Sequence, residues 1–163
     1  MEMQDHKHQH TTQEHNKHYK HLLIMVILSF IAMYVLMYAM VDTFSNVYMN
    51  VNQFYMAGLM TSPMIIIELL VMGAMYMNKK LNMLLIAIGA LLLIGFFVLI
   101  RQQVAVGDKQ FLKSMIPHHA GAILMCEEAN ITDPEIKKLC EEIKLSQQRE
   151  IDQMKTKLNE LKK

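Results

Sequence analysis

Charged side chains are almost absent from the middle of this 163-residue sequence. Between residues 22 and 100 only Asp42, Glu68, Lys79 and Lys80 carry a formal charge, although the whole chain has 16 Lys and Arg and 15 Asp and Glu. Such a gap excludes an ordinary soluble globule, in which charged residues are spread along the chain. The net charge is only +1, and no basic patch indicates a nucleic-acid partner.

The chain also lacks the residue patterns of common catalytic sites. It contains no recognisable Ser/His/Asp or Cys/His arrangement, and no Glu-x-x-His pair of the kind that holds two iron ions in helical bundles. We therefore do not expect an enzyme.

Three long apolar runs fill the middle of the chain, at residues 22–41, 54–77 and 81–100. Each has about 20 residues or more, which a helix needs to cross the hydrocarbon core of a bilayer. The first run is longer than the apolar part of a signal peptide, and no small-residue cleavage site precedes Asp42. We expect an all-α membrane protein whose three transmembrane helices contact the lipid bilayer.

The positions of the lysines predict the orientation of these helices. Lys and Arg beside a span favour the cytoplasmic side of a membrane. The N-terminal segment carries three lysines and the second connection carries Lys79 and Lys80, whereas residues 42–53 carry none. We expect a multi-pass protein of the plasma membrane, the inner membrane in a bacterium, with a cytoplasmic N-terminus and an extracytoplasmic C-terminal segment.

A histidine-rich tail precedes the first span. Residues 1–21 contain few apolar side chains, so they cannot bury enough surface to fold alone, and we expect a disordered cytoplasmic tail. Neutral imidazoles at these spacings could gather on Zn(II), Cu(II) or Ni(II), and a solvated tail without metal is the alternative. The histidines concerned are His6, His8, His10, His15, His18 and His21.

Two features of the spans allow more than one interpretation. Glu68 lies in mid-span, where a carboxyl group usually faces a partner or a cavity. Pro63 leaves unpaired backbone carbonyls near Ser62 or Leu59 that could be hydrogen-bond partners of Glu68. This possibility favours a structural role for Glu68 over ion conduction. Methionines also recur at helical spacing in the first two spans, where they could pass Cu(I) along or simply fill the apolar interior.

The segment after the third span, residues 101–163, predicts a helical hairpin. Two amphipathic stretches, at about 108–130 and 134–162, are separated by a turn in which Asp133 can cap the second helix. Folding the helices back about Asp133 brings two cysteines to the same height. Cys126 and Cys140 could then form a disulfide, supply additional metal ligands, or be merely buried.

Sulfur and imidazole groups converge at another height of the same hairpin. Met115 precedes His118 and His119 by three and four residues, so a thioether and at least one imidazole share a helix face. Thioether sulfur with imidazole suits Cu(I), and imidazole can also hold Cu(II), whereas zinc is less favoured. The pattern indicates a copper site.

These residues resemble a known family. The stretch from Asp108 to Met125 with its Met-x-x-His-His core, followed by Gln147-x-x-Glu150-Ile151-x-x-Met154, is similar to the domain of unknown function 305 family. The resemblance covers about residues 108–158, and it implies a ferritin-like helical fold and, in some members, extracytoplasmic copper binding or copper tolerance. By position, it implies copper contacts at Met115, His118, His119, Met125 and Met154, with Gln147 and Glu150 behind them.

These patterns predict a membrane-anchored metal-binding protein that serves copper homeostasis or tolerance. A two-helix hairpin cannot enclose a core by itself, so we expect a homo-oligomer formed through the C-terminal hairpin. Two other functions stay open. One is a structural membrane oligomer or assembly partner without metal, and the other is a metal transport component that uses Glu68 and the methionines of the spans.

Overall fold

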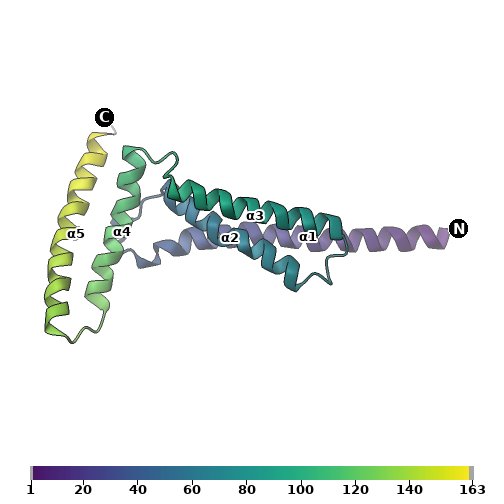
Figure 1. Ribbon diagram of the computed structural model, residues 1–163, viewed down its shortest axis with the longest axis horizontal. Coiled ribbons are helices and arrows are strands. Elements are labelled where there is room, and N and C mark those ends of the chain that lie inside the picture. Colours follow the sequence, from purple (N-terminus) through teal and green to yellow (C-terminus); the bar gives the residue numbers. More distant parts are fainter. Residues whose placement is uncertain (1, 162–163) are drawn as a thin grey trace. The chain divides into compact units, whose positions relative to one another are not determined.

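The computed structural model describes the backbone of residues 2–161 and the side chains of residues 17–161, and within these residues the chain is all-helical, without a strand. Five α-helices are joined by connections that include two short 3-10 helices (Figure 1). In chain order the elements are α1 (Glu2–Leu36), η1 (Met37–Met40), η2 (Phe44–Asn46), α2 (Val51–Val71), α3 (Lys79–Arg101), α4 (Asp108–Glu128) and α5 (Pro134–Glu160).

Three segments are long and apolar enough to cross a membrane, which confirms this part of the sequence prediction. They are Lys17–Met40, Val51–Val71 and Lys79–Arg101, of 24, 21 and 23 residues. The second segment ends at Val71 rather than at residue 77. The chain turns after Val71, and the side chain of Asn78 then caps α3 by accepting a hydrogen bond from the Leu81 N–H.

The chain divides into two compact units. The membrane unit comprises Met1–Tyr34 and Tyr55–Gln102, and the hairpin unit comprises Val35–Phe54 and Gln103–Lys163. The hairpin unit therefore combines the C-terminal hairpin with the connection between the first two spans. The sequence pattern did not predict this combination.

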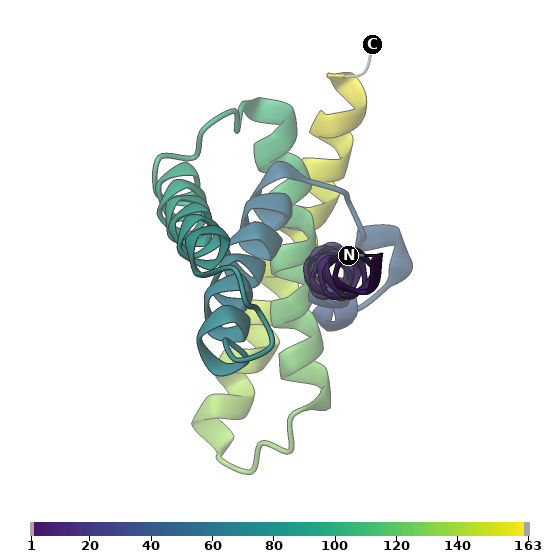
Figure 2. The same ribbon diagram turned by 90° about the vertical axis from the view of Figure 1, so that its right-hand side faces the viewer.

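Within the membrane unit, glycines allow α2 and α3 to approach each other closely. A Cβ atom on Gly58 would collide with the ring of Phe96, and one on Gly89 would lie 3.0 Å from the Ile66 side chain. On the other side of α2, the Thr61 hydroxyl lies 3.6 Å from the sulfur of Met33 in α1. Figure 2 shows the spans nearly end-on, with α2 between α1 and α3.

The first helix also includes the backbone of the histidine-rich segment, because α1 begins at Glu2. The sequence predicts a disordered tail here; the segment contains no Gly or Pro that would stop the helix of the first span from extending. The side chains of His6, His8, His10 and His15 lie outside the described residues. The His18 ring packs edge-on against Tyr76 at 6.2 Å between centroids, and His21 is exposed.

In the hairpin unit, α4 and α5 lie antiparallel and pack along their length (Figures 1 and 2). The predicted cap is confirmed, since Asp133 accepts hydrogen bonds from the N–H groups of Glu135 and Ile136. Five buried residues form the core, namely Ile116, Ala120, Ile123, Ile151 and Leu158. On α5 these residues lie in the half away from the loop, whereas on α4 they run from the middle of the helix toward its end, and no residue between 124 and 150 is buried.

The first connection holds the beginning of α4. The Val51 N–H donates to the Gln110 side-chain oxygen at 3.1 Å, and the Asn52 amide donates to the Ser114 hydroxyl at 3.2 Å. Val41 and Tyr48 pack against the core of the hairpin. The helix that carries the histidine pair is thus fixed on two sides, by α5 and by this connection.

Candidate metal centre

A groove of about 310 Å³ lies between α4 and α5, toward the open end of the hairpin. Three of the predicted metal contacts, Met115, His119 and Met154, lie on its wall together with Glu150. Met115 and His119 are one turn apart on α4, and Glu150 and Met154 are one turn apart on α5. The residues that line the groove are Phe111, Leu112, Met115, His119, Glu150, Gln153, Met154 and Lys157.

The imidazole of His119 is buried and has a partner at each nitrogen. Its Nδ1 lies 2.9 Å from the carbonyl oxygen of Met115, and its Nε2 lies 2.7 Å from Glu150 Oε2. A carbonyl oxygen can only accept, so Nδ1 carries the hydrogen in this contact. Nε2 is therefore the nitrogen that remains for a ligand on the groove side.

Glu150 is the present partner of that nitrogen. Hydrogen bonds from the Ser146 hydroxyl and then from His119 lower the pKa of the Glu150 carboxyl, because both favour its charged form. The Glu150 side chain is 47% exposed. It can therefore rotate into solvent and release the His119 nitrogen without burying a charge.

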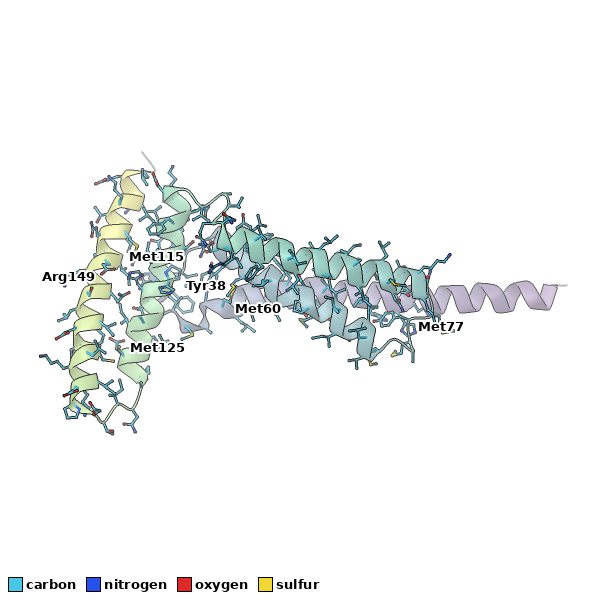
Figure 3. All side chains as sticks on the ribbon, viewed as in Figure 1. Tyr38, Met60, Met77, Met115, Met125 and Arg149 are labelled. Atoms are coloured by element: carbon cyan, nitrogen blue, oxygen red, sulfur yellow. The ribbon has the colours of Figure 1, made fainter. Side chains whose placement is uncertain are left out.

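The other predicted contacts lie outside the groove. His118 is exposed, and Gln147 is half-buried but not on the groove wall. Met125 is 54% exposed and follows Met115 by ten residues, which places it about 15 Å further along the helix at a 1.5 Å rise per residue (Figure 3). A single ion could not contact both methionines of one chain, so the structure brings together only three of the five predicted ligands.

The groove offers a soft set of donor atoms. Two thioether sulfurs and one imidazole nitrogen are the ligand types that favour Cu(I). Within residues 17–161, no group of three or more His, Cys, Asp or Glu side chains is arranged to hold a metal. A metal bound in the groove would therefore need the thioethers beside His119.

The sequence pattern did not assign Phe111, Leu112, Gln153 or Lys157 to the metal site, although all four line the groove. They flank the predicted ligands at helical spacing, since Phe111 precedes Met115 by one turn and Lys157 follows Met154. Once α5 is placed against α4, that spacing is enough to identify them.

Cys126 and Cys140 lie beyond the core, toward the loop of the hairpin. Both are free thiols and both are half-buried. Burial raises the pKa of the Cys126 thiol, and a hydrogen bond with the Cys140 side chain raises it further. The two thiols therefore influence each other across the hairpin.

Glu68 has a partner that the sequence did not indicate. Its Oε1 accepts a hydrogen bond from the hydroxyl of Tyr76 at 3.2 Å. The sequence predicts backbone carbonyls near Ser62 or Leu59 as partners, whereas the structure places the Tyr76 hydroxyl at this carboxyl group. Tyr76 precedes the third span, so the contact ties the end of α2 to the following turn and supports a structural role.

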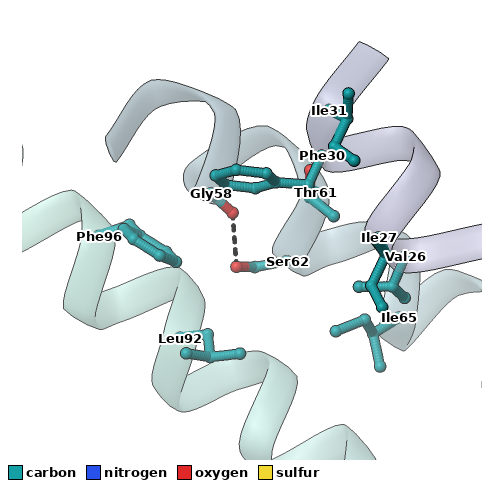
Figure 4. Close-up of a pocket in the computed structure, with 10 residues that line it drawn as sticks. All are labelled: Val26, Ile27, Phe30, Ile31, Gly58, Thr61, Ser62, Ile65, Leu92 and Phe96. Atoms are coloured by element: carbon teal, nitrogen blue, oxygen red, sulfur yellow. Dashed lines mark hydrogen bonds between the residues drawn. The ribbon is translucent and has the colours of Figure 1, made fainter. Parts of the chain in front are cut away.

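The membrane unit also contains an apolar cavity of about 230 Å³ between its three helices (Figure 4). Its two hydroxyl groups are already used, because Thr61 donates to the carbonyl of Ala57 and Ser62 donates to that of Gly58. The remaining lining is hydrocarbon, including Phe30 and Phe96. Such a cavity is poorly suited to a charged ion.

The different surroundings of the two histidines lead to a stability prediction. His119→Ala removes a buried ring and both of its hydrogen bonds, so we expect it to lower the free energy of unfolding of the hairpin by about 1 to 3 kcal/mol. The matched change His118→Ala removes an exposed ring and should alter it by less than about 0.5 kcal/mol. Urea unfolding of the full chain in detergent, followed by circular dichroism, measures both. Equal effects would contradict the assignment of His119 as the inward residue.

Comparison with known proteins places the chain in a family. Residues 71–158 match the family described as a domain of unknown function (DUF305), so the match includes α3 as well as the hairpin. An uncharacterised protein of Acanthamoeba polyphaga mimivirus is 38% identical over 144 residues, which cover 86% of this chain and 93% of that protein. No solved structure matches the chain. The family resemblance seen in the Met-x-x-His-His stretch is confirmed, and the chain belongs to the DUF305 family.

Proposed function

We propose that this protein is anchored in a membrane by its three spans and binds Cu(I) between α4 and α5, in the service of copper homeostasis or tolerance. The observation that carries the proposal is the convergence of Met115, His119 and Met154 on one groove. Two thioethers and an imidazole select a soft monovalent ion over the harder Mg(II) and Ca(II). The resemblance of the same residues to copper-binding members of the family supports the same ion.

The contacts of His119 are compatible with this role. Metal-binding histidines usually donate their second N–H to a carbonyl or carboxylate, which fixes the orientation of the ring. The contact between Nδ1 and the Met115 carbonyl provides such a partner. Copper would then take Nε2 in place of Glu150, with the Nε2 proton passing to solvent and the exposed Glu150 side chain turning toward water. Cu(II) is the alternative ion, and zinc is less favoured because the thioethers would contribute little to its binding.

Substitution of the two groove methionines tests the proposal directly. Met115→Leu/Met154→Leu keeps the volume of the side chains but removes both sulfurs, so we expect the dissociation constant for Cu(I) to rise by at least about tenfold. His118→Ala and Met125→Leu are matched controls that should change it by less than about threefold, because neither residue lies in the groove. An anaerobic competition titration against a chromophoric Cu(I) chelator measures the constant.

The titration should be repeated in the full chain carrying Cys126→Ser/Cys140→Ser, so that thiols do not contribute to the Cu(I) uptake. The histidine-rich segment is present in every variant and adds the same background. Equal and negligible uptake by the wild type and the double methionine variant would instead favour a structural membrane protein without metal. A loss in the controls as large as in the double variant would contradict the groove as the site.

We further propose that the N-terminus and the α2–α3 connection face the cytoplasm and that the hairpin faces the opposite side. Each of these two segments carries exposed lysines, which support the proposal. Lys17 and Lys20 lie at the start of the first span, and Lys79 and Lys80 lie at the start of the third. The absence of lysine and arginine from residues 42–53 supports it as well.

Labelling of single cysteines tests the orientation. In the Cys126→Ser/Cys140→Ser background, Asn159→Cys should react with an impermeant maleimide added to intact cells, and Lys80→Cys should react only after lysis. Both positions are exposed in the structure, so neither should be shielded by the protein itself. The reverse pattern would contradict the orientation. Labelling of both positions in intact cells would contradict a membrane crossing by the third span, which separates them.

The hairpins of separate chains are proposed to associate, as in a ferritin-like bundle of four helices. Three exposed residues, Phe111, His118 and Met125, recur every seven positions along α4. A repeat of seven forms one continuous stripe on a helix and is the spacing with which paired helices interlock. A second copy of the hairpin would cover this stripe and bury its apolar members.

A charge placed in the stripe should separate the chains. We expect the wild type to have a mass of at least two 18.9-kDa chains in mild detergent, and Met125→Glu to reduce it to one, because association would bury the carboxylate. Leu145→Glu is the control, since Leu145 is also exposed but lies outside the stripe. Native mass spectrometry reads the result, and a monomeric wild type would contradict the proposed association.

A further inference from the structure

The loop end of the hairpin has little apolar packing to hold it together. The buried core reaches only to Ile123 on α4 and begins only at Ile151 on α5, and no residue between 124 and 150 is buried. Two apolar side chains of α5 in this region, Ile136 and Leu139, are about half exposed. A helix pair without a buried core opens readily, so any stable closure of this end needs another kind of contact.

The two cysteines of the chain lie in this region, one on each helix. Cys126 is near the end of α4 and Cys140 is in the second turn of α5, each seven residues from Asp133. Both are half-buried, and the Cys140 side chain is among the groups that raise the pKa of the Cys126 thiol. The loop between them has defined ends because Asp133 caps α5 at its first turn.

We propose that Cys126 and Cys140 form a disulfide that links α4 to α5 at the loop end of the hairpin. A low-molecular-weight disulfide such as oxidised glutathione can supply the oxidising equivalents. One cysteine attacks a sulfur of glutathione disulfide and releases one glutathione thiol, and the other cysteine then attacks the mixed disulfide and releases the second. The two protons and two electrons lost by the cysteines thus leave with two molecules of glutathione.

A neutral bond fits this environment better than a metal held by two thiolates. The same burial that raises the pKa of the Cys126 thiol also disfavours an anionic complex in which both sulfurs are deprotonated. A disulfide carries no charge and meets no such penalty. Within residues 17–161, no third His, Cys, Asp or Glu is placed to complete a metal site with the pair.

The test is oxidation of the purified full-length protein. Incubation with oxidised glutathione should remove both free thiols, add no glutathione to the chain, and give one peptide pair joined through Cys126 and Cys140 in a protease digest analysed by mass spectrometry. Stable glutathione adducts at both cysteines, or disulfides that join two chains, would overturn the proposal.

A displaced pair provides the matched control. Leu139→Cys/Cys140→Ser keeps two thiols but moves the second by one residue, which turns it about 100° around α5, to a side chain that is 53% exposed. This variant should form the internal disulfide much more slowly and accumulate mixed disulfides with glutathione. Closure at the wild-type rate would show that mobility of the loop, rather than the placement of Cys126 and Cys140, governs the reaction.

The disulfide should also slow the opening of the loop end. It closes a loop of 15 residues, and the loss of loop entropy in the opened state predicts protection of the amides of residues 124–145 from hydrogen exchange about 100-fold greater than in the reduced protein. Unchanged exchange after complete oxidation would contradict a stabilising role. Because the cysteines lie outside the copper groove, Cu(I) binding in the Cys126→Ser/Cys140→Ser variant reports on the groove independently of this bond.

Discussion

The packing of Ile116 and Ile123 on α4 against Ile151 and Leu158 on α5 determines the positions of the side chains that line the groove. This apolar contact sets the register of the two helices, and the register brings Met115 and His119 opposite Glu150 and Met154. Neither helix has a groove on its own. A change that shifted one helix by a turn would move its donor atoms by about 5.4 Å and separate the sulfurs from the imidazole.

The same register makes Nε2 of His119 the point of competition in the groove. In the structure its partner is Glu150. The proposed copper ion would take the place of that carboxylate at Nε2 and would also bind the two neutral thioethers. The exchange is physically reasonable because the two partners differ in burial. His119 stays in the packed interior with its Nδ1 bound to the Met115 carbonyl, whereas Glu150 sits at the exposed edge and can return to water. The proposed binding of copper would therefore require no change in the core.

The periodic parts of the fold could be predicted from the sequence, and the choices between neighbouring residues could not. Apolar runs and the Asp133 cap identified the spans and the hairpin because each depends on residues close in sequence. Whether His118 or His119 faces inward depends on a rotation of 100° that only the contact with α5 determines. Tyr76 as the partner of Glu68, and the docking of the first connection on α4, likewise come from contacts between distant segments.

The extent of the family match bears on where the hairpin acts. The matched residues begin at 71, so they include α3 before they reach α4. The alignment with the mimivirus relative covers 86% of this chain and 93% of the relative. An alignment of this extent must include most of the apolar middle of this chain. The similarity between the two proteins therefore extends through the apolar segments of this chain and is not confined to the hairpin. The proposed copper site should therefore be tested in the whole chain, with its apolar segments, rather than in an isolated hairpin.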